Sequence, residues 1–309
     1  RHMKILMTGS SGFIGSALTP ILSKQYELQH LKSDLLDFDA VAQEVAVANP
    51  DIIVHLAART EVEKSFYEQI SFSQVNYVGT VNLIESARKL KKLKNFVFAS
   101  TMEVYGWQPI SDEIQHTGKF SKYEVFDEHT IPNPNAPYAV AKLGCEKYLE
   151  YAHRSYDLPF TAIRQTNAYG RTDNDFFVTE AIVTRMLKNP SVINMGYAEP
   201  WRNFIFIDDL LDAWIKIIAN VEKCSNGLIC TVGPDNAIRI KDYAQKIATK
   251  IGWNGEIKWD QQPKRHGEIY WLNRGCNTLK KLLDWEPQVD MDQGLDRTIE
   301  VWNKQLHNV

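Results

Sequence analysis

The chain has 309 residues, of which 44% are hydrophobic and 24% charged, and its formal net charge is −3. These values are ordinary for a globular protein and argue against a nucleic-acid partner or an anionic membrane surface. No apolar run reaches the ~20 residues of a membrane-spanning helix, so we expect a cytoplasmic protein. The four cysteines lack CxxC or Cys/His metal spacing, which is typical of reduced thiols and predicts no metal site.

A glycine-rich turn opens the chain. The apolar run 4–7 predicts a buried strand, which leads through GSSGFIG (9–15) into a predicted helix. Gly9 would permit the turn, Gly12 would let backbone N–H groups approach a pyrophosphate, and Gly15 would let the helix pack on the strand. Such turns also occur for conformational reasons alone, so the motif by itself is weak evidence for a dinucleotide site.

Strand-like and helix-like segments alternate as far as residue 187, which predicts a Rossmann-type doubly wound parallel sheet of the α/β class. The predicted strands are 4–7, 26–31, 51–55, 95–99 and 160–164. The predicted helices are 13–24, 38–48, 73–91 and 137–156, the last of them capped by Asn135 and begun by Pro137.

The second half has a different periodicity. We expect helices at 179–188, 208–221, 240–251 and 293–305 and a strand at 228–232. Since Arg1 and His2 resemble cloning residues, we expect a dinucleotide-binding domain at 3–165. A smaller, interleaved C-terminal substrate lobe would follow at 166–309, with some segments returning to the first domain. The long connection 107–134 follows the fourth strand, and its position predicts a lid.

Tyr138 and Lys142 lie one turn apart on a predicted helix. An ammonium beside a phenol favours the phenolate, so we expect Lys142 to lower the pKa of Tyr138 and make it a usable base. Alone, this spacing is a common surface coincidence. Its position after a nucleotide-binding βαβ start favours the catalytic interpretation.

The segment 99–106 leaves the fourth strand at its carboxyl end. Ser100 and Thr101 could offer hydroxyls to a substrate oxygen, and Glu103 could offer a carboxylate to an adjacent carbon. The plainer alternatives are that the hydroxyls cap the turn and that Glu103 is a solvated side chain.

Together these motifs resemble the extended short-chain dehydrogenase/reductase family, in particular its NAD(P)-dependent nucleotide-sugar epimerases and dehydratases. The resemblance covers nearly the whole chain, and the ordered series is far more specific than any one member. It rests on GSSGFIG (9–15), HLAA (55–58), NYVGTVNLIESA (76–87), STMEVYG (100–106), YAVAK (138–142), NAYG (167–170), RNFIFIDD (202–209) and LDWEP (283–287).

The resemblance implies roles for individual residues. Tyr138 would take the proton from a sugar hydroxyl as hydride passes to the nicotinamide, Lys142 would hold the nicotinamide ribose, and Thr101 would bind the reacting oxygen. The dinucleotide would also contact Gly9, Ser11, Gly12, Phe13, Ile14, Gly15, Leu56, Ala57 and Ala58. The substrate would contact Ser100, Met102, Asn167, Arg202, Arg265 and Glu268, with Asn167 and Arg202 at its diphosphate. For Arg202 the alternative is a surface ion pair with Asp208 or Asp209.

Glu103 separates the subfamilies. Once carbon 4 is oxidised, a carboxylate can remove the hydrogen from carbon 5, as a 4,6-dehydratase requires. Plain 4-epimerases usually lack this glutamate, whereas uronate decarboxylases keep one. Met102 stands where dehydratases carry an acid that protonates the leaving hydroxyl, and a thioether cannot donate a proton. Either Glu103 both removes the carbon 5 proton and protonates the leaving hydroxyl, or the reaction is not a standard elimination. The plainer alternative is that Met102 fills an apolar gap.

The cofactor preference depends on the end of the second strand, where NAD enzymes usually place an acid. Lys32 and Ser33 stand there and could hold a 2′-phosphate, which favours NADP over NAD. Asp34 could instead be the ribose acid, and Asp37 an adenine-side or capping residue.

The sequence therefore predicts an enzyme that acts on a nucleoside-diphosphate sugar, with a 4,6-dehydratase preferred. The alternatives are a 4-epimerase, a uronate decarboxylase, and a non-catalytic cofactor-binding regulator. A homodimer through the helices at 73–91 and 137–156 is also expected.

Overall fold

The computed structural model describes residues 2–58, 64, 66–108, 126–263, 268, 269, 271, 272 and 277–308. Six strands of this part form one parallel sheet in the order β10-β5-β4-β3-β1-β2. They are β1 (Lys4–Thr8), β2 (Glu27–His30), β3 (Ile52–His55), β4 (Asn95–Thr101), β5 (Phe160–Gln165) and β10 (Asn226–Val232). The prediction of a doubly wound parallel sheet is confirmed, and β1 and β3 flank the point where the strand order reverses.

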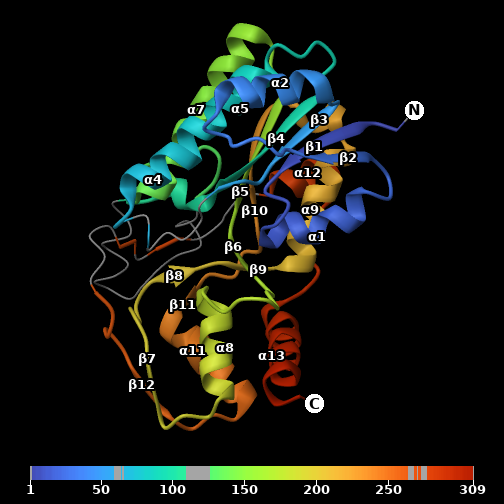
Figure 1. Cartoon of the computed structure of the whole chain (residues 1–309). Coiled ribbons are helices and arrows are strands. Elements are labelled where there is room, and N and C mark those ends of the chain that lie inside the picture. Colours follow the sequence, from blue (N-terminus) through green and yellow to red (C-terminus); the bar gives the residue numbers. More distant parts are fainter. Residues whose placement is uncertain are drawn as a thin grey trace.

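Helices cover both faces of the sheet (Figure 1). Leu6 and Ile53 pack toward one layer and Ile5 and Met7 toward the other, because successive side chains of a strand point to opposite faces. The first layer holds α2 (Phe38–Ala48), α5 (Gly79–Ala87) and α7 (Pro137–Tyr156). The second holds α1 (Phe13–Leu22), α9 (Ile207–Ala219) and α12 (Thr278–Leu283).

A smaller lobe lies beyond the carboxyl ends of the strands (Figure 1). Its apolar core includes the ring of Tyr243, stacked on Phe204 with 4.0 Å between ring centroids. Its helices are α8 (Val178–Leu187), α11 (Ile240–Ile251) and α13 (Met291–His307). Its short strand pairs are β6 (Asn167–Tyr169) with β9 (Phe204–Phe206), β7 (Val192–Asn194) with β12 (Glu256–Lys258), and β8 (Trp201–Arg202) with β11 (Ile238–Arg239). The chain enters this lobe, returns to the large sheet through α9 and β10, enters the lobe again, returns to the sheet through α12 and ends in the lobe with α13.

Two predicted elements differ from the structure. The helix expected at 73–91 is three pieces, α4 (Gln69–Ser73), the π-helical turn η1 (Gln74–Val78) and α5. The carbonyl of Asn76 in that turn accepts hydrogen bonds from the Thr80 hydroxyl and, across to α7, from Cys145 Sγ. The residue that precedes α7 as its N-cap is Ala136 rather than Asn135, with Pro137 in the first turn as expected.

The connection 107–134 is described only at its ends, so the predicted lid at 109–125 lies outside the described residues. These ends are held together, since Trp107 N–H donates to the carbonyl of Asn133 at 2.8 Å. None of the described helices is long and apolar enough to cross a bilayer.

Candidate active site

The glycine turn between β1 and α1 leaves room for a ligand. Gly9 has φ +74°, and a Cβ there would lie 2.6 Å from Ala57 N. A Cβ on Gly15 would lie 2.0 Å from the Gly9 carbonyl oxygen, so both positions require glycine. A Cβ on Gly12 would meet only that same oxygen, at 3.4 Å. Because Gly12 caps α1 without any side-chain hydrogen bond, the first N–H groups of the helix suit an anion beside Ser11, Phe13 and Ile14.

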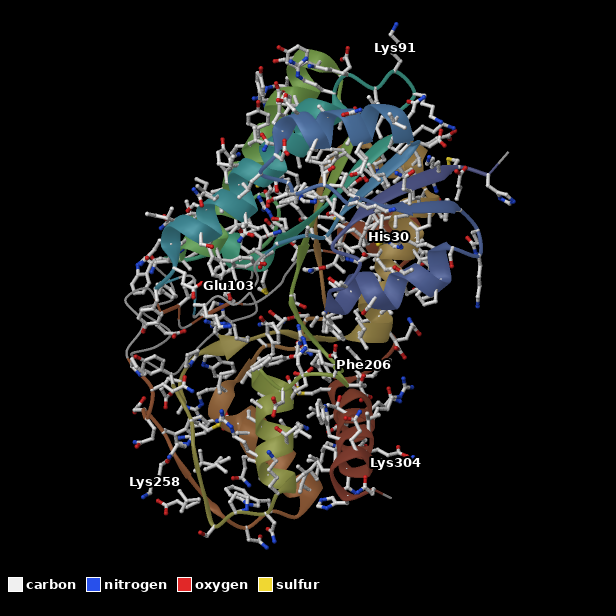
Figure 2. All side chains as sticks on the ribbon, in the orientation of Figure 1. His30, Lys91, Glu103, Phe206, Lys258 and Lys304 are labelled. Atoms are coloured by element: carbon white, nitrogen blue, oxygen red, sulfur yellow. The ribbon has the colours of Figure 1, made fainter. Side chains whose placement is uncertain are left out.

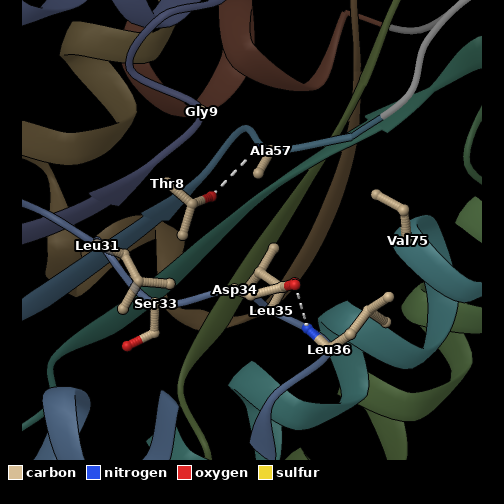
Figure 3. A pocket seen from close by; sticks show the side chains of 9 residues that line it. All are labelled: Thr8, Gly9, Leu31, Ser33, Asp34, Leu35, Leu36, Ala57 and Val75. Atoms are coloured by element: carbon tan, nitrogen blue, oxygen red, sulfur yellow. Dashed lines mark hydrogen bonds between the residues drawn. The ribbon is translucent and has the colours of Figure 1, made fainter. Parts of the chain in front are cut away.

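The loop after β3 meets this turn at the reversal point of the sheet. Thr8 Oγ1 accepts hydrogen bonds from Leu56 N and Ala57 N at 3.1 and 3.0 Å, and it contacts His55 Nδ1 at 2.6 Å. Ala58 follows directly. A cavity of about 220 Å³ opens here (Figure 3), lined by Thr8, Gly9, Leu31, Ser33, Asp34, Leu35, Leu36, Ala57 and Val75. Its position beside the turn fits the adenosine half of a dinucleotide.

The polar groups of Lys32 and Ser33 have an unpredicted partner in the helix that follows them. Both backbone N–H groups and the Ser33 hydroxyl donate to the carboxylate of Glu44 on α2. Asp34 accepts the N–H of Leu36 at 3.0 Å, and Asp37 caps α2 by accepting the N–H of Ala40. The expected capping role of Asp37 is therefore present.

The structure brings Tyr138, Lys142 and Thr101 together. Tyr138 and Lys142 lie one turn apart on α7, and the Tyr138 hydroxyl hydrogen-bonds the Thr101 side chain. Thr101 Oγ1 also accepts the N–H of Glu103, where β4 passes into the 3-10 turn η2 (Met102–Tyr105). The Lys142 ammonium donates to the carbonyl of Ala99 at 2.7 Å. All three side chains are buried.

The charge state of this group differs from the expectation. The pKa of Tyr138 is raised, first by burial and then by the negative charge of Glu103, while the Thr101 hydrogen bond acts in the opposite direction. Burial lowers the pKa of Lys142 to about 8. The expected lowering of the Tyr138 pKa was wrong for this structure, because desolvation of the phenolate outweighs the favourable contacts.

Glu103 lies at the junction of the sheet and the smaller lobe (Figure 2), where it forms an ion pair with Arg202 of β8. The Nε–Oε1 distance is 3.9 Å. The Arg202 guanidinium also binds a carboxylate oxygen of Glu268 at 3.2 Å and the carbonyls of Trp201 and Ile269 at 2.7 Å. Three predicted site residues therefore meet. The alternative pairing of Arg202 was wrong, because Asp208 pairs with Arg297 and Asp209 accepts N–H groups of the 283–290 segment.

The side chains of Ser100 and Met102 contact groups in the protein interior. The Ser100 hydroxyl, itself buried, donates to the fully buried carboxylate of Glu146, which Arg164 binds at 2.7 Å. Met102 is 2% exposed and packs in an apolar cluster with Tyr105, Phe126, Ile269, Trp271 and Leu272. The Ser100 hydroxyl thus has an acceptor in the interior, and the surroundings of Met102 match the alternative that this side chain fills an apolar gap.

Of the two remaining predicted substrate residues, Asn167 begins β6, and its amide donates to the carbonyl of Asn203 at 3.2 Å. Arg265 lies outside the described residues. Among the residues that the structure covers, no group of three or more His, Cys, Asp or Glu side chains is arranged to hold a metal ion.

The predicted site residues did not include Glu44, Glu146 and Arg164, which determine what Lys32, Ser33 and Ser100 can bind. No local sequence motif marks these three residues as partners. The one available signal for the Glu146–Arg164 pair was an acid in a predicted helix and a base in the predicted strand that follows it.

Comparisons with known proteins agree with this geometry. Residues 5–233 match the family described as "NAD dependent epimerase/dehydratase family". A dTDP-D-glucose 4,6-dehydratase of Dictyostelium discoideum is 30% identical over 271 residues, which cover 79% of this chain but only 61% of that protein. A putative UDP-glucose 4-epimerase of Methanocaldococcus jannaschii is 25% identical, with 97% of this chain and 98% of that protein covered. The solved UDP-glucose 4-epimerase of Thermotoga maritima superposes with a TM-score of 0.85 at 26% identity, covering 98% of this chain and 100% of that one.

Proposed function

The chain belongs to the NAD-dependent epimerase/dehydratase family, and on that premise we propose that it is a nucleoside-diphosphate-sugar 4,6-dehydratase. The observation that carries the proposal is the carboxylate of Glu103, close enough to Tyr138 for its charge to raise the pKa of the phenol. A carboxylate in that position can act on the carbon next to the one oxidised.

Residues 3–165 would bind NAD or NADP, and residues 166–309 would mainly bind the nucleotide sugar. The fit to a dinucleotide rests on the turn at Gly9–Gly15, the uncapped start of α1 and the adjoining cavity. When bound, the nicotinamide would accept hydride from the sugar and later return it, and its positive ring would favour the phenolate of Tyr138. Lys142 would hold the ribose beside it.

In the proposed reaction, Thr101 orients the carbon 4 hydroxyl and Tyr138 removes its proton. Glu103 then removes the carbon 5 hydrogen as a proton and gives that proton to the carbon 6 hydroxyl, which leaves as water. Return of the hydride to carbon 6, with the proton that Tyr138 took up delivered to carbon 5, would complete the 4-keto-6-deoxy product. Arg202, with Asn167 and Arg265, would bind the diphosphate, since a guanidinium suits phosphate oxygens. Glu268 holds Arg202 in place at 3.2 Å and would fix its orientation.

Mass spectrometry on a panel of UDP-, dTDP-, GDP- and CDP-sugars tests the proposal. The expected product has lost one water; loss of carbon dioxide would instead mean a decarboxylase. No nicotinamide reduction with any sugar, despite tight dinucleotide binding, would mean a non-catalytic regulator.

A 4-epimerase is the second candidate, and the packing of Met102 favours it. Buried among aromatic rings, Met102 leaves no acid at that position to protonate a leaving hydroxyl. An epimerase would give a product of unchanged mass and inverted configuration at carbon 4.

We also propose a homodimer through the segments 73–91 and 137–156, which form η1, α5 and α7, together with the adjoining α4. These neighbouring helices carry exposed apolar side chains, with Ile70 76%, Val78 45% and Val140 55% exposed. V140D, with V47D on α2 as the control, should convert a dimer to a monomer in size-exclusion chromatography with light scattering. A monomeric wild type would contradict the proposal.

A further inference from the structure

The loop after β2 presents three hydrogen-bond donors that converge on one carboxylate. Glu44 Oε1 accepts the N–H of Ser33 at 2.9 Å, the Ser33 hydroxyl at 2.7 Å and the N–H of Lys32 at 3.1 Å. Glu44 Oε2 accepts the N–H of Lys32 at 2.9 Å. Converging backbone N–H groups and a hydroxyl are what an enzyme uses to hold a phosphate, and here an internal anion already occupies them.

This carboxylate lies next to the cavity at the reversal point of the sheet. Ser33 lines that cavity together with Thr8, Gly9 and Asp34 (Figure 3). The pKa of Glu44 is lowered, because the hydrogen bonds from Ser33 and Lys32 and the charge of the Lys32 ammonium together outweigh the effect of burial. The group is therefore an anion at neutral pH, and the Lys32 ammonium lies near enough for its charge to favour that form.

Accordingly, we infer that Glu44 determines cofactor specificity: its carboxylate occupies the donors that a 2′-phosphate would need, so the enzyme selects NAD and rejects NADP. A 2′-phosphate beside Ser33 would lose these donors and face a fixed negative charge. A ribose 2′-hydroxyl carries no charge and could donate a hydrogen bond to Glu44 Oε2. That oxygen accepts one hydrogen bond, from Lys32 N–H, and has a second lone pair for another. This inference rests on the proposed function only in requiring that a nicotinamide dinucleotide binds. It reverses the preference for NADP suggested by Lys32 and Ser33.

Isothermal titration calorimetry of NAD and NADP with the wild type and E44Q tests the inference without measuring turnover. Gln keeps the shape and the acceptor oxygen but removes the charge. We expect the wild type to bind NAD at least about tenfold more tightly than NADP, and E44Q to reduce that ratio about tenfold, chiefly by improving the affinity for NADP. D39N, which removes the same charge from the exposed first turn of α2, should leave the ratio unchanged.

Each outcome decides the matter. A wild type that prefers NADP, or an E44Q variant with an unchanged ratio and normal NAD binding, overturns the inference but leaves the proposed function intact. A change of equal size in D39N would show a general charge effect and also overturns it. Binding of neither dinucleotide to the wild type overturns both.

Discussion

The phenol of Tyr138 is buried beside a carboxylate, and that neighbourhood decides which protonation state it prefers. Burial and the charge of Glu103 both raise the pKa of Tyr138. Glu103 in turn is held by Arg202, which also binds Glu268. In the proposed reaction the two groups act in succession, so the charge that Glu103 needs for its own step makes the first proton removal by Tyr138 harder.

Replacing Glu103 with Gln separates these two effects. Dehydration should fall about 100-fold to 10,000-fold, because the group that removes the carbon 5 hydrogen is lost. Oxidation at carbon 4 should persist, and its rise with pH should move to lower pH, because a cause of the raised Tyr138 pKa has been removed. Stopped-flow absorbance of nicotinamide reduction across pH 6–10 would measure the shift, with E256Q on the exposed side of β12 as the control. Unimpaired dehydration by E103Q would contradict the assigned role.

At the scale of elements, the junction of β1, α1 and β3 forms the dinucleotide site proposed above. β1 and β3 pair in parallel with Thr8 opposite His55, so the loops that follow them lie side by side. Gly9 and Gly15 permit close backbone contacts, whereas Gly12 borders open space. The three glycines of this motif therefore serve two purposes: Gly9 and Gly15 allow the backbone to pack, and Gly12 leaves space for the ligand. Loss of the first should lower stability, and loss of the second should weaken binding.

The matched variants G15A and G12A make that distinction. G15A should lower the free energy of unfolding by ~3 kcal/mol, since its Cβ would lie 2.0 Å from a carbonyl oxygen. G12A should change stability by less than about 1 kcal/mol but weaken NAD binding about tenfold, because the methyl group enters the space left for the phosphates. Urea unfolding and calorimetric titration give the two values. Equal loss of stability in both variants would contradict the division.

At the scale of the whole molecule, the buried imidazole of His55 connects the large sheet to the helix layer that holds α5. His55 of β3 is 1% exposed and lies between Thr8 of β1 at 2.6 Å and Thr80 of α5 at 2.8 Å. Burial, and to a lesser extent the charge of Lys142, lower its pKa from 6.5 to about 3. The folded protein therefore requires an uncharged imidazole, whereas the unfolded chain takes up a proton below pH 6.5.

Stability should accordingly fall as the solution is acidified. The contribution of His55 is complete above its unfolded pKa and is lost as the pH falls toward about 3. The free energy of unfolding should drop by ~1.4 kcal/mol per pH unit from this group alone. Urea unfolding at pH 7.5, 6 and 5 would measure the slope, and H55Q should flatten it by about that amount. Identical slopes in the two proteins would exclude His55 as the cause.

The amino-acid sequence by itself determined the sheet, most helices and the glycine turn. Strands buried on both faces read as continuous apolar runs, and Gly9 and Gly15 occupy positions where a side chain would collide with the backbone. The placing of Tyr138 and Lys142 one turn apart on one helix also follows from their spacing in the sequence. Local patterns suffice for these features.

Only the tertiary structure decided what the polar groups bind. Ser100 meets Glu146 across 46 residues of chain, Lys32 and Ser33 meet Glu44 of the next helix, and Arg202 meets Glu103 from another lobe. The break at η1 and the raised pKa of Tyr138 likewise depend on packing and desolvation. A hydroxyl, an N–H group or a guanidinium can serve many partners equally well, so its choice follows from which acceptor the folded chain brings within reach and how little water remains there.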